Sequence, residues 1–541
     1  MLEDNLPVKR VILISGHISS GKSTLATELA KHCNMDVFKT NDVLKARLGH
    51  RLANNRKALQ QEGEHLDVKT RGRWVANELM KWLRRATRKP MLIIDSVRTV
   101  EQINGVREMF GPVVTHIHLT APRPELAKRY KERYRQGREA TDDYSEAQED
   151  KTEQAVDSLS DTADVVIDTN RCTVEDVLVR ATSHLNLYGG KGNGYVDVLI
   201  GGQYGSEGKG QIAAYLAKEY DLLVRVGGPN AGHKVYEKPE PYAYHQLPSG
   251  TLRCEARLLI GPGAALDVEK LLKEIAERGV SADRLTIDEQ AMIICEQDKQ
   301  REKKLKKKIG STGQGVGWAT ARRIRDRSEA TTQLARDIPE LRPFLGSAIE
   351  VLYEVLSRGG RVFLEGTQGT GLSLYHGFYP YVTSRDTTVA GCLAESGIPP
   401  SHVRKVIMVC RTYPIRVASP PGGTSGPMSQ DTNWAEISRR SGIGYDELLK
   451  TEKTTTTYRD RRVGEFDWSL LRKAVLLNAP TDIALTFTDY LDRANRNARR
   501  FEQLTPATIS FIQEIERVSR APVSLISTRF SYRSIIDRRS W

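Results

Sequence analysis

The sequence predicts an α/β protein of two domains, each with a mostly parallel sheet flanked by helices. Apolar runs of strand length recur along the 541 residues, and Gly-rich or helical segments follow them, as in parallel sheets. A Gly-rich break, LYGGKGNGY at residues 187–195, separates an early set of these runs from a later set and is typical of a short flexible linker. We therefore predict a first domain at residues 1–186, a linker at 187–195 and a second domain at 196–541.

Composition excludes several classes of protein. No apolar stretch approaches the length that spans a membrane, and the segment MLEDNLPVKRVILIS lacks a signal-peptide layout. The six cysteines are scattered without paired spacing, which argues against a disulfide framework or a zinc site. We expect a cytoplasmic protein with no membrane partner.

The formal net charge of +13 admits either nucleic acid or small anionic substrates as partners. The one dense basic run, REKKLKKKIG at residues 301–310, contains no aromatic residue on which bases could stack. A solvated helix face beside a phosphate loop is therefore favoured over a nucleic-acid patch. The alternative, a nucleic-acid-processing ATPase, predicts ATP hydrolysis stimulated by DNA or RNA and salt-sensitive binding.

A P-loop pattern, GHISSGKS at residues 16–23, follows the strand-like VILIS and opens the helical pattern SGKSTLATELAKH. Backbone N–H groups of such a turn, together with a helix N-terminus, form an anion site, in which Lys22 reaches the terminal phosphates and Ser23 is placed for magnesium. We predict that nucleotide is bound by Gly16, Gly21, Lys22, Ser23 and Thr24.

Further signals complete this first domain. The strand-like MLIID ends at Asp95, whose carboxylate is placed to hold the metal through water, and Arg98 follows it. A basic helix at residues 123–139 resembles the lid of a nucleoside-monophosphate-kinase-like P-loop protein, although an ordinary exposed helix is the alternative. Its candidate phosphoryl clamps are Arg129, Arg133, Arg135 and Arg138. The acceptor cannot be identified, and our hypothesis is a nucleoside or nucleoside monophosphate of the second domain's pathway.

Three Gly-rich segments characterise the second domain. They are GGQYGSEGKG at residues 201–210, GGPNAGHKV at 227–235 and FLEGTQGTGL at 363–372, and each follows a strand-like apolar run. The C-terminal ends of strands are where phosphorylated ligands bind in α/β folds. Each loop taken alone is equally typical of a tight turn.

Together with further segments, these loops resemble adenylosuccinate synthetase, the purine-pathway ligase that joins aspartate to a 6-oxopurine nucleotide. The further segments are GSTGQGVG (310–317), YPYVTSRDTT (379–388), RTYPIRV (411–417), TTTTYRDRRVGEFDW (454–468) and VSLIST (523–528). The resemblance runs from about residue 195 to the C-terminus. It implies Mg²⁺, a nucleoside triphosphate as phosphoryl donor, a purine nucleoside monophosphate and L-aspartate as substrates, and a 6-phosphoryl intermediate.

The resemblance also implies residue roles. Lys209, beside Gly208, binds phosphate, His233 is the general acid, and the Gly232 carbonyl is a magnesium ligand. The residues implied to contact the acceptor nucleotide are Asn230, Thr312, Gln368 and Thr383, with Gln368 also catalytic. An arginine near Arg325 or Arg327 comes from the partner subunit in the family, which implies a homodimer. The aspartate carboxylates are implied to meet Thr457, Arg459 and Arg461, a role suited to forked guanidinium donors.

The first loop departs from the family at Ser206, where the family has an Asp that is both base and magnesium ligand. A hydroxyl cannot replace a carboxylate as base, so either the ligase is weakened, as in a nucleotide-sensing protein, or its acceptor has changed. The same change resembles the viral branch, 2-aminoadenylosuccinate synthetase, which acts on dGMP. Because the other catalytic positions are retained, we favour GMP or dGMP as acceptor, with IMP as the alternative, and keep Ser206 as a catalytic and metal residue.

A second departure concerns the phosphoryl donor. Asp489 and Ser527 are retained as nucleotide-binding positions, but the family's STGP turn is replaced by STRF, with Arg529 and Phe530. Such bulky residues change a base-recognition turn that reads guanine, so ATP or dATP is expected as donor beside GTP. The segment between Asp492 and Pro506 is also short for the family.

Overall fold

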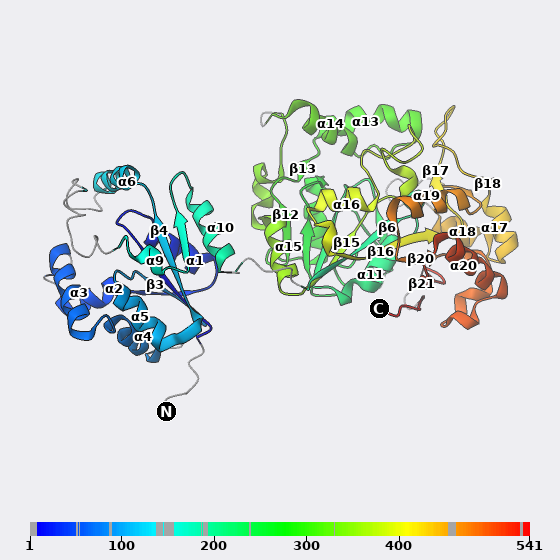
Figure 1. The fold of residues 1–541 in the computed structure, drawn as a ribbon. Coiled ribbons are helices and arrows are strands. Elements are labelled where there is room, and N and C mark those ends of the chain that lie inside the picture. Colours follow the sequence, from blue (N-terminus) through cyan, green and yellow to red (C-terminus); the bar gives the residue numbers. More distant parts are fainter. Residues whose placement is uncertain are drawn as a thin grey trace. The chain divides into compact units, whose positions relative to one another are not determined.

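A computed structural model describes residues 8–49, 52, 55–85, 89–136, 144, 156–185, 187, 193–236, 240–328, 331–452, 461–530 and 534–541. The chain divides into two compact units, Met1–Gly190 (unit 1) and Lys191–Trp541 (unit 2), each with its own sheet and core (Figure 1). The predicted fold class, two mostly parallel sheets flanked by helices, is confirmed. The predicted domain boundaries stay predictions, and most of the linker at 187–195 lies outside the described residues.

Unit 1 contains one five-stranded parallel sheet in the order β2-β3-β1-β4-β5. Its elements are β1 (Arg10–Gly16), α1 (Lys22–His32), β2 (Asp36–Lys39), α2 (Thr40–Leu48), α3 (Arg56–Thr70), α4 (Trp74–Arg84), β3 (Met91–Asp95), α5 (Val100–Phe110), β4 (Val114–Thr120), α6 (Arg123–Arg135), α9 (Leu159–Thr162), β5 (Val165–Asp168) and α10 (Val174–His184). The strand predicted to end at Asp95 is therefore present.

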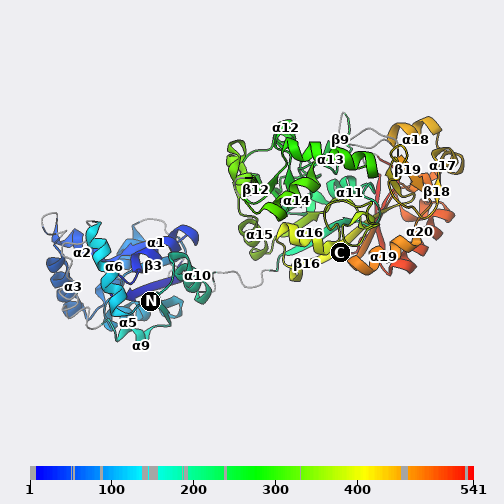
Figure 2. The same cartoon turned by 90° about the horizontal axis from the view of Figure 1, so that it is seen from above.

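The sheet of unit 1 is buried on both faces because successive side chains of a strand point to opposite sides. Along β1, Val11 and Leu13 join the cluster that contains α4 and α5. Ile12 and Ile14 join the cluster that contains α1 and α10. Helices therefore cover both faces, as the two views show (Figures 1 and 2), and the loops after β1 and β3 meet at one edge.

A buried polar cluster lies at the end of β1, directly before the P-loop. The Ser15 hydroxyl lies 2.7 Å from Nε2 of His116 and 2.8 Å from Nδ1 of His118. The hydroxyl can donate to one ring and accept from the other, which requires that the ring that accepts is neutral. Burial, together with the other histidine and Arg107, lowers the pKa of His116 to about 4. Burial, with His17 and Lys22, lowers the pKa of His118 to about 4.

We expect the stability of unit 1 to fall on mild acidification. Between pH 6.5 and about 4 an unfolded histidine binds a proton that the folded one does not, so stability is complete above this window and is lost as the pH falls through it. The slope is about 1.4 kcal/mol per pH unit for each histidine. Calorimetry of the full chain at pH 7 and pH 5 measures it. In His118→Asn the side-chain amide takes the place of Nδ1 but does not titrate. If the stability of this variant depended on pH as strongly as that of the wild type, His118 would not contribute to the loss of stability.

Unit 2 is built on a ten-stranded sheet in the order β14-β12-β10-β7-β15-β6-β16-β20-β21-β22, in which only the β21–β22 pair is antiparallel. The strands of this sheet are β6 (Tyr195–Gly201), β7 (Leu222–Arg225), β10 (Arg257–Ile260), β12 (Leu285–Asp288), β14 (Leu345–Gly346), β15 (Arg361–Glu365), β16 (Val403–Arg411), β20 (Asp482–Thr486), β21 (Val523–Ser527) and β22 (Ile535–Asp537). The shorter strands outside it are β8 (His233–Val235), β9 (Tyr242–Tyr244), β11 (Ala265–Leu266), β13 (Met292–Ile293), β17 (Ile415–Val417), β18 (Asp431–Thr432) and β19 (Arg461–Gly464).

The helices of unit 2 follow the strands in the expected alternation. They are α11 (Lys209–Leu216), α12 (Val268–Arg278), α13 (Glu296–Ile309), α14 (Val316–Asp326), α15 (Ala348–Ser357), α16 (Val389–Ser396), α17 (Trp434–Ser441), α18 (Tyr445–Thr451), α19 (Trp468–Asn478) and α20 (Pro506–Ser519). In α12 the side chain of Asp267 caps the N-terminus, and Gly279, at φ 60°, ends the helix, because a left-handed C-cap favours glycine. The basic run at residues 301–310 lies on α13, mostly exposed, as predicted.

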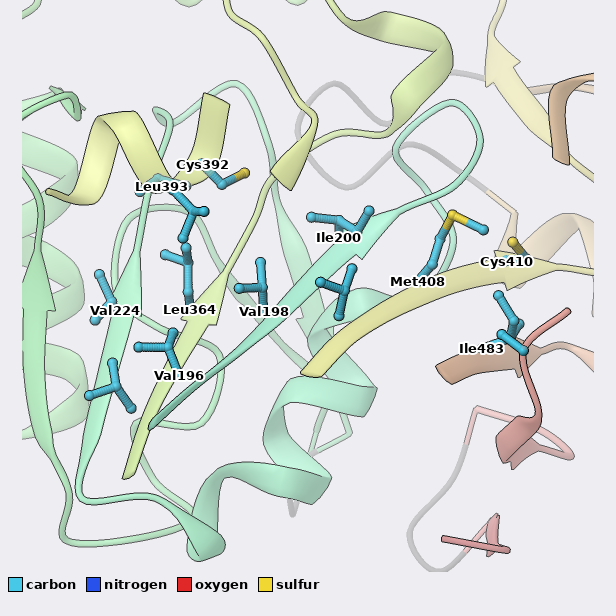
Figure 3. Packing of buried hydrophobic residues seen from close by; sticks show 14 of the residues in the cluster. Val196, Val198, Ile200, Val224, Leu364, Cys392, Leu393, Met408, Cys410 and Ile483 are labelled. Carbon is cyan, nitrogen blue, oxygen red and sulfur yellow. The ribbon is translucent and has the colours of Figure 1, made fainter. Parts of the chain in front are cut away.

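Two hydrophobic clusters cover the two faces of the large sheet. On one face, Val198 of β6 and Leu364 of β15 lie beneath Leu393 of α16 (Figure 3). Strand β6 lies between β15 and β16, and β7 pairs with β15. The loops after β6, β7 and β15 therefore meet at one edge of the sheet, since the strands are parallel.

Within the described residues, no helix is long and apolar enough to cross a membrane.

Candidate active site

A cavity of approximately 470 Å³ opens in unit 2 where the three Gly-rich loops meet. Its wall is completed by α13, the loop before α14, residues 379–384 and the start of β19. The predicted site residues that line it are Ser206, Asn230, Gly232, His233, Thr312, Gln368, Thr383 and Arg461. The structure thus brings together residues that are up to 255 positions apart in the sequence, from Ser206 to Arg461.

The other predicted residues of unit 2 are placed differently. Gly208 is the N-cap of α11 at φ 90°, and the buried Lys209 is ion-paired with Glu207 at 2.7 Å. Arg325 is exposed on α14 and is paired with Asp326. Ser527 is the last residue of β21, and Asp489 lies in the 3-10 helix Thr488–Tyr490 that follows β20. Thr457 and Arg459 lie outside the described residues.

His233 is held by a buried carboxylate that the sequence analysis missed. Its Nδ1 contacts Glu365, which also accepts from Arg225 at 3.0 Å and from the backbone N–H of Ser249 at 2.8 Å. Burial and Arg225 lower the pKa of His233 to about 3, so the ring is neutral. Because the carboxylate of Glu365 can only accept, we assign the proton to Nδ1. Burial raises the pKa of Glu365, but Arg225 and His233 outweigh this effect and bring it to about 2.

Five buried atoms of cavity-lining residues have no hydrogen-bond partner in the described part of the chain. They are Nε2 of His233, Oδ1 of Asn230, Nε2 of Gln368, Nε of Arg461 and the hydroxyl oxygen of Tyr204. A buried polar atom without a partner costs about 1–3 kcal/mol. The five atoms therefore form a set of hydrogen-bonding groups that a polar ligand in the cavity could complete.

Ser206 is exposed at the cavity, which the carboxylate of Glu302 also lines. The adjacent Glu207 is buried and accepts from the backbone N–H groups of Gln203 and Gly205 at 3.1 and 2.7 Å, in addition to Lys209. Glu207 therefore stabilises the loop itself.

A second buried network connects this loop to Arg461. Arg411 donates to the carbonyl of Ser206 at 3.2 Å and to Glu452 at 2.9 Å. Glu452 also accepts from Arg461 at 3.2 Å and from the Tyr490 hydroxyl at 2.7 Å. Because both Arg411 and Glu452 are buried, this network fixes the position of Arg461 relative to Ser206.

The residues predicted to bind magnesium in unit 2 supply oxygen atoms only. The Ser206 hydroxyl and the Gly232 carbonyl belong to the cavity wall, beside the unpartnered Oδ1 of Asn230. Among the described residues no group of three or more His, Cys, Asp and Glu could hold a metal alone. This donor set fits Mg²⁺, which retains waters and binds through substrate phosphates.

Asp489, in the 3-10 helix that follows β20, is buried and only partly paired. Its Oδ2 lies 3.1 Å from Nε of Arg496, which also contacts Glu447 at 2.7 Å, while its Oδ1 has no partner among the described residues. Burial raises the pKa of Asp489 to about 6. Arg496 belongs to the segment that is short for the family, and sequence reasoning did not identify it.

Unit 1 contains a cleft of approximately 980 Å³ around the P-loop. Gly21, Lys22, Ser23, Thr24 and Asp95 line it, and Lys22 donates to the carbonyls of Gly16 and His17, both at 2.7 Å. Gly16 is required at its position, since at φ +140° an added Cβ would lie 2.2 Å from a backbone oxygen. Arg129 and Arg133 of the predicted lid also line the cleft, and Arg138 lies outside the described residues.

The missed residues share a signal that sequence reasoning could have used. Arg225 ends β7 and Glu365 ends β15, each after a run of buried apolar residues. A charged side chain at the buried end of a strand needs a partner. Such residues are therefore candidates even without a motif.

Comparison with known proteins agrees with this geometry. The family model for adenylosuccinate synthetase matches residues 198–337 and 325–497, and a model for an AAA domain matches residues 12–148. Adenylosuccinate synthetase of Pyrococcus horikoshii is 38% identical over 351 residues, covering 63% of this chain and 98% of that protein. The synthetase of Methanocaldococcus jannaschii is 40% identical over 352 residues, which cover 63% of this chain and 96% of that protein.

Two solved structures share the fold of unit 2. Cyanophage S-2L succinoaminodeoxyadenylate synthetase, bound to dGMP and to dATP as an energy donor, is 28% identical with a TM-score of 0.54, covering 64% of this chain and 96% of its own. Fully ligated adenylosuccinate synthetase from Plasmodium falciparum is 23% identical with a TM-score of 0.55, covering 65% and 100%. The family-model match runs from residue 198 to residue 497, more than half of the 541 residues, and includes most of the cavity wall. The chain belongs to the adenylosuccinate synthetase family.

Proposed function

We propose that unit 2 joins L-aspartate to the 6-position of dGMP or GMP, with hydrolysis of a nucleoside triphosphate, and that unit 1 is a nucleotide kinase. The observation that carries the proposal is Ser206, an exposed small side chain in a cavity that is also lined by Asn230, His233 and Gln368, to which the family resemblance assigns roles. A serine leaves room for the 2-amino group of guanine, which an aspartate would crowd. The dGMP bound by the cyanophage relative supports the same acceptor.

The chemistry requires activation of a poor leaving group. The γ-phosphoryl group moves to the 6-oxygen as N1 of the purine loses its proton, and the donor leaves as the nucleoside diphosphate. The aspartate amine then attacks C6 and loses a proton, and phosphate leaves with the 6-oxygen. The Ser206 hydroxyl and the Gly232 carbonyl would hold Mg²⁺, which would neutralise the charge of the phosphates. Asn230, with Thr383 3.4 Å from its amide nitrogen, binds the acceptor nucleotide.

His233 acts on the transferring group through Nε2. Before substrate arrives the ring is neutral, because Nδ1–H donates to Glu365 and burial disfavours a second proton. A phosphoryl anion beside Nε2 raises the pKa of His233, since a nearby negative charge favours the imidazolium. The protonated Nε2 then donates to the 6-oxygen or the phosphoryl oxygens as charge develops. Gln368, whose amide nitrogen is unpartnered, positions the purine edge.

Aspartate is placed by Arg461, together with Thr457 and Arg459 as predicted from the sequence. Two hydrogen bonds of Glu452, one to Arg461 and one to Arg411, fix the position of the Arg461 guanidinium group before aspartate binds. A homodimer in which Arg325 reaches the partner's nucleotide completes the proposed assembly.

The acceptor is tested by mass spectrometry of products formed from aspartate, magnesium and ATP or GTP. IMP, dIMP, GMP and dGMP are offered in parallel. A succinyl adduct on GMP or dGMP supports the proposal, and an adduct on IMP or dIMP alone assigns the ordinary acceptor. Absence of any adduct would leave a protein that binds nucleotides without turnover.

The donor in this proposal is ATP or dATP. Asp489 reads guanine in the family through two neighbouring N–H groups, but here Arg496 contacts Oδ2 and leaves Oδ1 for a single donor. An adenine 6-amino group matches one free oxygen. The dATP bound by the cyanophage relative supports this choice.

Replacing Arg496 with alanine is expected to raise the ratio of kcat/KM for GTP over ATP by about tenfold, the effect of one hydrogen bond. The variant frees Oδ2 of Asp489 for a second N–H group of guanine. Initial rates at saturating acceptor measure the ratio for both donors. Arg499→Ala, an exposed arginine of the same segment, is the control, and an equal ratio in both variants would argue against donor selection by Arg496.

A further inference from the structure

We propose that the cleft of unit 1 contains a subsite for a 2-aminopurine nucleoside monophosphate, with guanine or 2-aminoadenine as its base. The inference rests on the proposed kinase activity of unit 1 and names its acceptor. The γ-phosphoryl group of ATP would move to an oxygen of the acceptor phosphate. The bond from Pγ to the β-phosphate oxygen breaks, a bond to the acceptor oxygen forms, and ADP leaves together with a nucleoside diphosphate.

The cleft continues beyond the P-loop. Its volume of approximately 980 Å³ lies at the upper end of the range of about 300–1,000 Å³ for ligand sites. Its wall runs from the P-loop along α2 and α3 to Trp74 and Gln102. The cleft therefore has room for an acceptor nucleotide beside the triphosphate.

One face of α3 forms the far wall. Gln60, Gly63, Glu64 and Asp67 all line the cleft, and their spacing of three, four and seven residues puts them on one side of the helix. This face carries an amide and two carboxylates but no cation. It therefore suits hydrogen-bond donors of a ligand and repels a phosphate.

Asp67 is held rigidly at the end of this face. Trp74 Nε1–H donates to Oδ1 at 2.7 Å, and Gln102 Nε2 lies 2.9 and 3.0 Å from the two oxygens. Gln102 is itself fixed, because its Oε1 accepts from the backbone N–H of Arg98 at 2.9 Å. Both Trp74 and Gln102 are buried. A carboxylate oriented in this way is a preorganised acceptor for N–H groups.

The two carboxylates discriminate between purines by their edges. Guanine presents N1–H beside its 2-amino group, and 2-aminoadenine presents amino groups at positions 2 and 6. Adenine offers one amino group next to N1, a lone pair that would face a carboxylate oxygen. The apolar side chains of Leu44 and Leu59 line the same part of the cleft and suit the faces of a ring.

Cations also line the cleft. Lys39, Lys45 and Arg98 line the cleft together with Asp95. They suit an acceptor phosphate, because both the forked guanidinium group of arginine and the ammonium group of lysine bind phosphate oxygens. The acceptor is thus oriented with its phosphate toward Lys22 and its base toward Asp67.

The test uses the full chain with ATP and magnesium but without aspartate, so that ligation cannot proceed. Formation of nucleoside diphosphate is followed by chromatography with dGMP, 2-aminoadenine deoxynucleoside monophosphate, dAMP and dCMP. We expect kcat/KM for at least one 2-aminopurine nucleotide to exceed kcat/KM for dAMP by about tenfold or more, which is the effect of at least one hydrogen bond. Comparison of the reactions with dGMP and with 2-aminoadenine deoxynucleoside monophosphate identifies which base the subsite accepts. Equal or faster transfer to dAMP or dCMP would overturn the inference while leaving the kinase proposal intact.

Variants separate base recognition from loss of function. Asp67→Asn is expected to lower kcat/KM for the 2-aminopurine by about tenfold or more while transfer to dAMP is unchanged or faster, because an amide can donate to adenine N1. Equal loss on every acceptor would indicate a structural role and overturn the assignment. Asp161→Asn, an exposed carboxylate on α9, is the matched control. Lys22→Ala should abolish all transfer, and transfer to no monophosphate by the unmodified chain would refute the kinase proposal itself.

Discussion

Replacing His233 with asparagine is expected to lower kcat for ligation by about 10²- to 10⁴-fold, the usual contribution of a general acid. Asparagine places an amide N–H near the position of Nδ1, so the hydrogen bond to Glu365 is retained. What it removes is Nε2, the unpartnered atom of this cavity-lining residue. The loss should therefore appear in kcat and much less in the affinity for the acceptor.

The measurement is single-turnover formation of the succinyl adduct, with acceptor binding determined separately by calorimetry. His402→Asn is the control, because His402 uses Nδ1 to bind the carbonyl of Gly194 at 3.1 Å and asparagine can replace that contact. If His233→Asn keeps more than a tenth of the wild-type kcat, Nε2 does not act on the transferring group.

Glu365 is a less informative target for the same question. It neutralises Arg225 and accepts from Ser249 as well as from His233. Removing one member of a buried ion pair costs about 3–5 kcal/mol, because an unpaired charge is left behind. A Glu365 variant would therefore mix loss of stability with loss of catalysis.

The sequence predicted the elements that depend on local patterns. Apolar runs located β3, β6 and β15. The three Gly-rich loops predicted where ligands would bind, since a parallel sheet collects such loops at one edge.

The pairs that fix the site could not be predicted in the same way. Arg225 and Glu365 are 140 residues apart, and Arg411 and Glu452 are 41 residues apart. No periodicity links such residues, because their contact depends on the order of strands in the sheet. The same reason explains why Asp67 and Gln102 were missed, and why Arg496 was not recognised as the partner of Asp489.

The loop at Ser206 shows how a local change acts through its surroundings. Glu207 cannot supply the missing base, since its carboxylate is buried and bound by Lys209 and two backbone N–H groups. Residue 206 is therefore the position at which a carboxylate can be restored to the cavity without altering the loop. Its side chain is exposed, and Arg411 contacts only its backbone carbonyl.

Ser206→Asp is expected to exchange the acceptor. The larger side chain crowds the 2-amino group and should lower kcat/KM for dGMP by about 100-fold, the upper range of discrimination by shape. The new carboxylate supplies a base and should raise kcat/KM for dIMP by about 10²-fold, the lower end of general-base effects. Mass spectrometry of succinyl adducts from an equimolar mixture of dGMP and dIMP measures both changes together.

Two further substitutions separate volume from charge at this position. In Ser206→Asn the side chain has nearly the volume of aspartate but no charge. This variant should therefore lose activity with dGMP without gaining activity with dIMP. Ser206→Ala removes the hydroxyl but keeps the space, so it should still prefer dGMP. If the aspartate variant retained the dGMP preference, the 2-amino group would not lie beside residue 206. If the asparagine variant gained dIMP as strongly as the aspartate variant, size rather than a restored base would determine the acceptor.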